Sequence, residues 1–152
     1  QEIARGLSEL HMTGMRFECH KLGDYNIIND AYNASPMSME ASLSTLHQVT
    51  VTKGKRAIAV LGDMLELGHV AVAAHRKVGR QAAEAGASCV ITLGEMGREI
   101  AAGAKEAGLK QVYACDTHQQ AADRLKALLK PGDTVLFKGS RGMAMEKIID
   151  LI

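Results

Sequence analysis

The sequence contains few aromatic residues and almost no net charge. Phe, Trp and Tyr make up 3% of the 152 residues, Trp is missing altogether, and the formal net charge is +1. Proteins that hold single-stranded nucleic acid stack bases on aromatic side chains in a basic groove, and proteins that bind anionic membranes carry a basic face. The composition therefore argues against a nucleic-acid or membrane-surface partner.

Long apolar runs and closely paired cysteines are missing as well. No apolar run approaches the roughly 20 residues of a membrane-spanning helix, and no secretory signal is visible. The three cysteines, Cys19, Cys89 and Cys115, are widely spaced and form no CxxC motif, which indicates free thiols in a reducing cytoplasm. The chain begins with Gln1 rather than Met, so we expect it to be part of a longer protein.

Three common motifs of binding and catalytic sites are also absent. The sequence has no GxGxxG, no GxxxxGK[ST] and no GxSxG. It therefore lacks the dinucleotide fingerprint, the P-loop and the nucleophile elbow that these motifs form.

The sequence does contain a regular alternation of short apolar runs and longer helical patterns. Apolar residues make up 47% and charged residues 23%, as in an ordinary globular domain. Strands are expected at 15–22, 24–30, 55–63, 88–94, 110–116 and 133–139, and helices at 36–49, 69–86, 95–107, 117–130 and 143–152. This alternation predicts one Rossmann-like α/β domain over residues 1–152, with a mainly parallel sheet and helices on both faces.

The stretch IINDAYNASPMSMEASL, residues 27–43, places an acid at a strand end, followed by a Ser-Pro pair typical of a helix start. Ligands of open α/β sheets gather at the carboxyl ends of the strands. There Asp30 could accept ribose hydroxyls, and Tyr32 and Asn33 could add polar contacts. The same residues also suit an ordinary turn, so both interpretations stay open.

The stretch LGDMLELGHVAVAAH, residues 61–75, carries two acids and two histidines. Such residues could suggest a metal site, but His69 and His75 are six positions apart and do not share a helix face as i, i+4 ligands would. A loop with acids near a helix start is the stronger interpretation. Binding of an ammonium group by Asp63 or Glu66 is a better functional hypothesis than a metal.

The stretch FKGSRGMAME, residues 137–146, places Lys138, Ser140 and Arg141 among glycines, between a strand and a helix. Glycines allow close backbone approach, and a helix start offers free N–H groups. Arg141 can bind a carboxylate or a phosphate through two parallel hydrogen bonds. The stretch predicts an anion site, and the alternative is a turn with two solvated cations.

Together, NDAYNASPMSMEASL, VLGDMLELG with a following His, and KGSRGMAMEKII resemble the C-terminal domain of the Mur ligases, in order and over nearly the whole chain. Two departures are small: NASP stands where the family usually has NANP, and Gly-Met-Arg where it usually has Gly-Arg. The resemblance implies an ATP-dependent amide-bond ligase of peptidoglycan synthesis. It points to the branch that joins D-alanyl-D-alanine to UDP-N-acetylmuramoyl-tripeptide through an acyl phosphate.

The resemblance also implies roles for single residues. Arg16 would approach the ATP phosphates, and Asp30, Tyr32 and Asn33 would form a wall of the nucleotide site. The dipeptide site would be lined by Asp63, Glu66, Lys138, Ser140 and Arg141. ATP and Mg²⁺ would serve the full-length enzyme, whose other two domains would carry the UDP-sugar site, the P-loop and the metal ligands. This domain would then hold no catalytic residue and no metal.

Two alternatives remain at the level of the sequence. One is the C-terminal domain of another Mur ligase or of a folylpolyglutamate synthetase, which would share the fold and the strand-end acid. The other is a nucleotide-binding or interaction module without catalysis. The loops at 61–68 and 138–146 favour the dipeptide-adding branch, because relatives of this kind diverge in their substrate loops.

Overall fold

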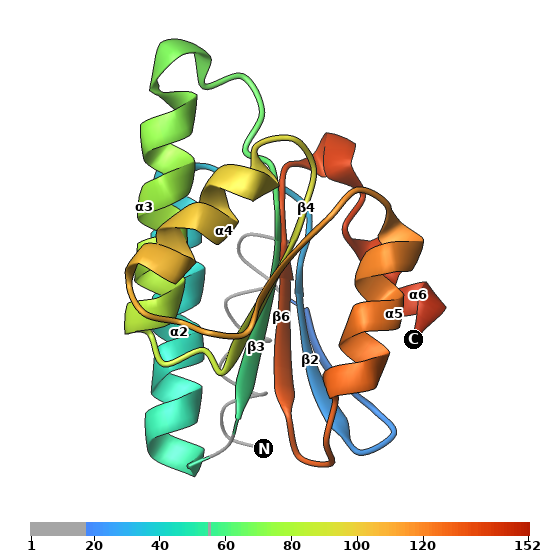
Figure 1. Cartoon of the computed structure of the whole chain (residues 1–152). Helices are drawn as coiled ribbons and strands as arrows, with labels where there is room; N and C mark the ends of the chain where they lie inside the picture. Colours follow the sequence, from blue (N-terminus) through green and yellow to red (C-terminus); the bar gives the residue numbers. More distant parts are fainter. Residues whose placement is uncertain (1–17, 55) are drawn as a thin grey trace.

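A six-stranded sheet forms the centre of the molecule, with helices packed on both faces (Figure 1). The computed structural model describes residues 18–54 and 56–152. The strands are β1 (Glu18–Leu22), β2 (Tyr25–Asp30), β3 (Ala57–Gly62), β4 (Cys89–Leu93), β5 (Val112–Cys115) and β6 (Thr134–Lys138), in the spatial order β1-β2-β6-β3-β4-β5. All neighbours are parallel except β1 and β2, which pair as an antiparallel hairpin. The predicted mainly parallel sheet is confirmed.

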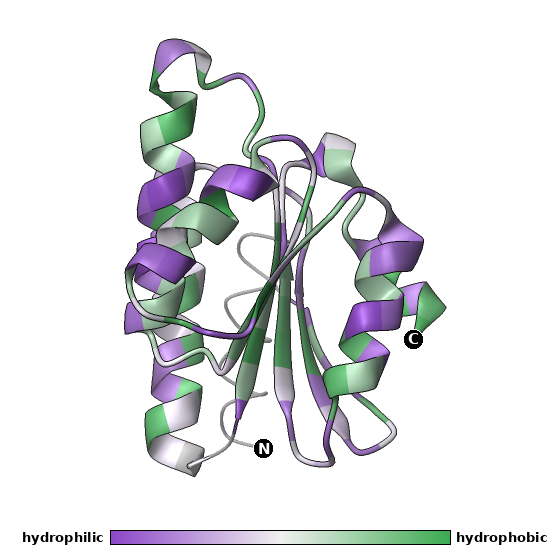
Figure 2. Cartoon of the chain, viewed as in Figure 1, coloured by the Kyte–Doolittle hydropathy of each residue, from purple (hydrophilic) through white to green (hydrophobic). Residues whose placement is uncertain are grey.

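The two faces of the sheet are covered by different helices. The first face carries α2 (Pro36–Lys53), α3 (Ala71–Glu84) and α4 (Gly97–Glu106), and the second carries α5 (His118–Leu128) and α6 (Glu146–Leu151). Side chains alternate between the faces along each strand, so that Ala59 and Leu61 pack toward the first set while Ile58 and Val60 pack toward the second. Because both faces are covered, every residue of β3, β4 and β6 is buried, and Figure 2 shows hydrophobic green along the middle of the sheet.

Helix α2 begins where its sequence predicts. The Ser35 side chain accepts a hydrogen bond from the Ser38 backbone N–H at 3.1 Å, and Pro36 occupies the first turn. The predicted apolar stripe is buried in full and consists of Met39, Leu43, Leu46 and Val49. The helix continues four residues beyond the predicted end and stops at Gly54, whose φ of 64° is left-handed.

The last helix is shorter than predicted. Instead of a continuous helix over 143–152, a 3₁₀ turn, η2 (Arg141–Met143), is followed by Ala144 in a left-handed conformation, with φ 49°. The break lets the buried side chain of Met145 pack against β3 and β6, where a Cβ on Gly62 would lie 2.6 Å from the Met145 sulfur. The predicted helix start directly after the Gly-rich loop is therefore wrong.

An ion pair between the partly exposed Arg56 and the buried Asp133 joins β3 and β6 at their amino ends. Arg56 Nε lies 3.0 Å from Asp133 Oδ1, and Arg56 Nη2 lies 3.1 Å from Asp133 Oδ2. Arg56 also donates to the Leu128 carbonyl at 2.9 Å. The hydrogen bond to Asp133 raises the pKa of the Arg56 guanidinium, which therefore keeps its positive charge. The pair fixes the lower edge of the sheet.

No helix within residues 18–54 and 56–152 is long and apolar enough to cross a membrane.

Candidate functional site

Three polar loops meet at the carboxyl edge of the sheet, which is the upper edge in Figure 1. They follow β2, β6 and β3, three strands that lie side by side because β6 is inserted between the other two. After β2 and β3 the chain crosses to the first face of the sheet, and after β6 it crosses to the second face. Where neighbouring strands lead to opposite faces in this way, α/β proteins commonly bind ligands at the carboxyl edge of the sheet. Arg16, the predicted phosphate contact, lies outside the described residues.

The loops after β2 and β6 are joined by a buried ion pair. Asp30 and Lys138 are direct neighbours in the register of the two parallel strands, and their side chains are 6% and 3% exposed. Lys138 Nζ donates to Asp30 Oδ2 at 2.8 Å and to the Asn33 carbonyl at 2.9 Å. Ser42, on helix α2, donates to the same Asp30 oxygen at 2.5 Å. One carboxylate oxygen thus connects a strand end, a helix and the neighbouring strand.

This pair bears on two predicted roles. Lys138 is a predicted dipeptide contact, and its ammonium group binds the Asp30 carboxylate and the Asn33 carbonyl in the turn after β2. Asp30 is a predicted ribose contact, and its hydrogen bonds within the described residues go to Oδ2 rather than to Oδ1.

Tyr32, Asn33 and Arg141 are the exposed residues at the junction of these two loops. The Arg141 guanidinium carbon lies 5.2 Å from the centroid of the Tyr32 ring, within the range of a cation–π contact. Asn33 Oδ1 accepts the Ala34 N–H at 2.8 Å and so shapes the turn, as the ordinary-turn interpretation predicts. The structure thus brings a predicted nucleotide contact, Tyr32, against a predicted dipeptide contact, Arg141.

The loops after β3 and β6 are held together by Ser140. The Ser140 N–H donates to the Asp63 carbonyl at 2.9 Å, and the Ser140 hydroxyl accepts the Leu65 N–H at 2.8 Å. Ser140 is 6% exposed, and these are bonds to backbone groups. The two loops therefore form one hydrogen-bonded unit.

The two candidate acids for an ammonium group have different surroundings. Asp63 is 8% exposed, and its Oδ1 accepts the Gly97 N–H at the start of α4 at 2.8 Å, where a carboxylate also meets the positive end of the helix dipole. Glu66 is exposed and has a φ of 65°. Asp63 thus holds a helix in place, while Glu66 presents its carboxylate to solvent.

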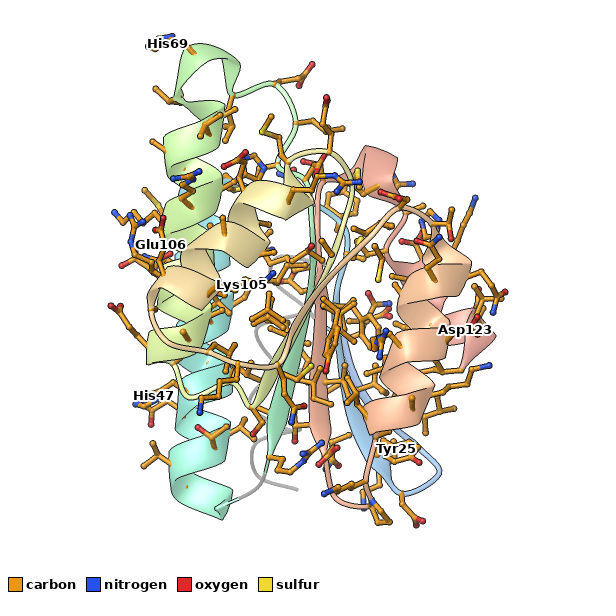
Figure 3. The ribbon with its side chains drawn as sticks, viewed as in Figure 1. Tyr25, His47, His69, Lys105, Glu106 and Asp123 are labelled. Atoms are coloured by element: carbon orange, nitrogen blue, oxygen red, sulfur yellow. The ribbon has the colours of Figure 1, made fainter. Side chains whose placement is uncertain are left out.

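The two histidines of the second loop also differ in their surroundings. His75 is completely buried: its Nε2 accepts the Met64 N–H at 2.9 Å, and its Nδ1 donates to the Ala71 carbonyl at 2.6 Å. His69 lies exposed at the outer tip of the molecule (Figure 3). Within the described ranges, no three His, Cys, Asp or Glu side chains are grouped so that they could hold a metal ion.

The cysteines are free thiols, and the predicted burial of Cys89 and Cys115 in strands is confirmed. Burial raises the pKa of Cys89 to about 11. Burial, together with the nearby Asp30 carboxylate, raises the pKa of the half-buried Cys19 to about 11 as well. Thiols with such high pKa values are poor nucleophiles at neutral pH.

Sequence analysis did not identify Ser42 or Met145 as parts of this site. Ser42 could have been found, because it falls on the helical stripe between Met39 and Leu46, where a polar residue needs a buried partner. Met145 had no comparable signal, since its place depends on the close approach of β3 and β6.

Comparisons with known proteins agree with this arrangement. The family described as Mur ligase, glutamate ligase domain, matches residues 15–141. The UDP-N-acetylmuramoyl-tripeptide–D-alanyl-D-alanine ligase of Bacillus subtilis is 41% identical over 157 aligned residues, which cover 100% of this chain and 34% of that protein. The ligase of the same name from Mycobacterium tuberculosis strain H37Rv is 36% identical over 83% of this chain and 28% of its own length.

Solved structures show the same relationship. The MurF ligase of Thermotoga maritima in complex with ADP superposes with a TM-score of 0.75 and 26% identity, over 90% of this chain and 30% of that one. A MurF structure from Acinetobacter baumannii gives a TM-score of 0.78 and 28% identity, again over 90% of this chain and 30% of that one. The chain spans about a third of the length of these relatives. Since the family match covers most of the chain and contains the loops after β2 and β3 in full, this chain belongs to the Mur ligase family.

Proposed function

We propose that this chain is the C-terminal domain of an ATP-dependent ligase that joins D-alanyl-D-alanine to UDP-N-acetylmuramoyl-tripeptide in peptidoglycan synthesis. The observation that carries the proposal is the junction of three loops at one sheet edge, in a chain that is similar over its whole length to a UDP-N-acetylmuramoyl-tripeptide–D-alanyl-D-alanine ligase. Because ATP and UDP-linked substrates are cytoplasmic compounds, we infer a cytoplasmic location for the full-length protein.

The reaction needs an activated carboxylate, because a free carboxylate is a poor electrophile. The terminal carboxylate of the tripeptide would take the γ-phosphoryl group of ATP and release ADP. The amine of D-alanyl-D-alanine would then attack the carbonyl carbon of the acyl phosphate, and phosphate would leave. The enzyme contributes mainly the positioning of two anions and the stabilisation of charge.

On the nucleotide side, we assign the exposed Tyr32 and Asn33 to a wall of the ATP site. Asp30 is 6% exposed, and its Oδ1, which receives neither the Ser42 nor the Lys138 hydrogen bond, is the proposed acceptor for a ribose hydroxyl that enters this wall. Arg16 keeps its proposed role at the phosphates. The solved structure of the relative from Thermotoga maritima is a complex with ADP, which supports the proposal of a nucleotide site. We assign no Mg²⁺ ligand to the described residues; the metal would be held, with the P-loop, by the remaining part of the full-length protein and would clamp the phosphates.

On the dipeptide side, exposure separates contacting residues from supporting ones. Arg141 is exposed and can bind the carboxylate of the dipeptide, and the exposed Glu66 can bind its ammonium group. Asp63, Ser140 and Lys138 are buried and hydrogen-bonded, so we assign them to the support of these loops.

Substitution of Arg141 tests the assignment. In the full-length ligase, Arg141→Ala should raise the KM for D-alanyl-D-alanine by about 30-fold, as expected for the loss of a bidentate charge-assisted contact, with a much smaller change in the KM for ATP. Arg80→Ala is the matched control, because Arg80 is an equally long surface cation that pairs with Glu106 between α3 and α4. An Arg141 variant in which only ATP kinetics change would place this side chain with Tyr32 in the nucleotide site and contradict the assignment.

A further inference from the structure

Asp30 and Lys138 form a buried ion pair above the apolar core, at the carboxyl edge of the sheet. The strand residues around them, Ile28, Leu61 and Leu136, are buried hydrocarbons. A buried ion pair is seldom the most stable choice, because the loss of hydration offsets much of the attraction, and apolar residues of similar volume often serve stability as well. Stability alone therefore does not account for this pair.

The pair holds the turn that carries the proposed nucleotide contacts. Lys138 Nζ binds both the Asp30 carboxylate, at 2.8 Å, and the carbonyl of Asn33, at 2.9 Å. Ser42, on helix α2, adds a second hydrogen bond to the Asp30 carboxylate. The exposed Tyr32 lies between Asp30 and Asn33, so both ends of its segment are anchored on a single ammonium group.

We propose that Lys138, assisted by Ser42, is a positioning residue for the nucleotide: it fixes the Asp30 carboxylate and the turn to Asn33 in the geometry that receives ATP, and it does not contact the dipeptide. Its side chain is 3% exposed and lies on the β2 side of the sheet edge. This inference rests on the proposed function, in which the turn after β2 faces ATP.

The chain supplies a matched control at the opposite edge of the same sheet. Arg56 and Asp133 form a second cation–carboxylate pair, whose carboxylate is 2% exposed. Arg56 also binds the Leu128 carbonyl, and Asp133 accepts the Lys130 N–H at 2.8 Å, so this pair fixes a turn at the amino ends of the strands. A substitution of Arg56 therefore disturbs the packing of β6 at its amino end and leaves the three loops at the carboxyl edge unchanged.

The test compares steady-state kinetics and thermal stability of full-length variants. Lys138→Met should raise the KM for ATP about tenfold, because it removes two charge-assisted hydrogen bonds from the turn, and should leave the KM for D-alanyl-D-alanine within about twofold. Ser42→Ala should raise the KM for ATP by a smaller factor. Arg56→Met should lower the Tm and leave both KM values unchanged.

Two outcomes would overturn the positioning role. A rise in the KM for the dipeptide in Lys138→Met would show that Lys138 contacts that substrate. Equal kinetic effects of Lys138→Met and Arg56→Met, at a similar loss of Tm, would show that Lys138 only supports the fold.

A double-mutant cycle keeps the test informative if Lys138→Met folds poorly. Asp30→Asn combined with Lys138→Met leaves no unpaired buried charge, so this protein should regain stability. If Lys138 acts through Asp30, adding Lys138→Met to Asp30→Asn should leave the KM for ATP within about twofold of the value for Asp30→Asn alone; a further rise of about tenfold would contradict the inference. An unchanged KM for ATP in Asp30→Asn would overturn the nucleotide assignment itself, whereas an effect of Asp30→Asn with none from Lys138 would overturn the positioning role alone.

Discussion

At the scale of single residues, most polar side chains of the carboxyl edge face other parts of the protein. Asp63, Ser140 and His75 each accept a hydrogen bond from a backbone N–H and thereby fix a loop or a helix start. Tyr32 and Arg141, in contrast, reach solvent. The sequence was sufficient to nominate all of these except His75 as site residues. Which of them face inward depends on neighbours far apart in the chain, and a single sequence does not contain that information.

The thiols provide a prediction at this scale. Burial and the Asp30 carboxylate raise the pKa of Cys19 from 9.0 to about 11, so the folded protein keeps this proton at pH values where an unfolded chain releases it. At pH 8 only about 0.1% of such a thiol is ionised, and the thiolate is the nucleophile. Alkylation of Cys19 by iodoacetamide should therefore be slow in the native protein and should accelerate about tenfold per pH unit up to about pH 11.

Mass spectrometry of native and urea-unfolded samples would measure this rate for each cysteine. The unfolded sample is the control, because its thiols have an ordinary pKa. Native labelling of Cys19 at pH 8 as fast as in urea would refute the prediction.

At the scale of helices and strands, apolar periodicity and capping residues predicted nearly every element. Ser35 caps α2 as expected, and Thr117 caps α5 in the same way, since each side chain accepts the backbone N–H of the third residue after it. The main error is at the last helix, where the favourable packing of Met145 against β3 and β6 outweighs the local helical preference of residues 143–145. Local patterns do not reveal such long-range contacts.

Helices α3 and α4 offer a prediction about packing. They cross closely because Gly79 and Gly103 have no Cβ: an added Cβ would overlap the Ile100 carbonyl in the first case and the Arg76 carbonyl in the second. Gly103→Ala should lower the free energy of unfolding by about 2 kcal/mol, even though Ala favours the helix, because backbone atoms cannot move aside cheaply.

Urea denaturation would measure the effect. Gly97→Ala is the graded control, since its Cβ would lie 3.1 Å from the Thr92 side chain and should cost less. A Gly103→Ala protein as stable as the parent would show that the two helices can separate without loss.

At the scale of the whole molecule, the fold class was predictable and the order of the strands was not. The alternation of strands and helices implies a parallel sheet, but it does not say that β6 pairs with both β2 and β3. That insertion is what brings residues 30–33, 63–66 and 138–141 together. The sequence identified the three stretches through their resemblance to one family, and the topology explains why they lie at one place.

The proposed division of the enzyme predicts how this chain behaves alone. The sequence contains no P-loop, and its relatives are about three times as long. The isolated chain should therefore hydrolyse no ATP above background and should bind ADP only weakly, with a Kd of about 1 mM or higher, because most phosphate contacts would lie elsewhere. Phosphate release and calorimetry would measure the two quantities, and ATPase activity from this chain alone would contradict the assignment.

The central position of β6 also governs the order in which the protein can form during synthesis. Before residues 134–138 leave the ribosome, the strands described here can pair only as two separate sets, β1 with β2 and β3 with β4 and β5. Each set would expose an unpaired edge at the future centre of the sheet, and exposed edges invite pairing with other chains. Completion of the domain thus waits for one of its last-made elements, and its long-range pairings belong to the slow class of folding events.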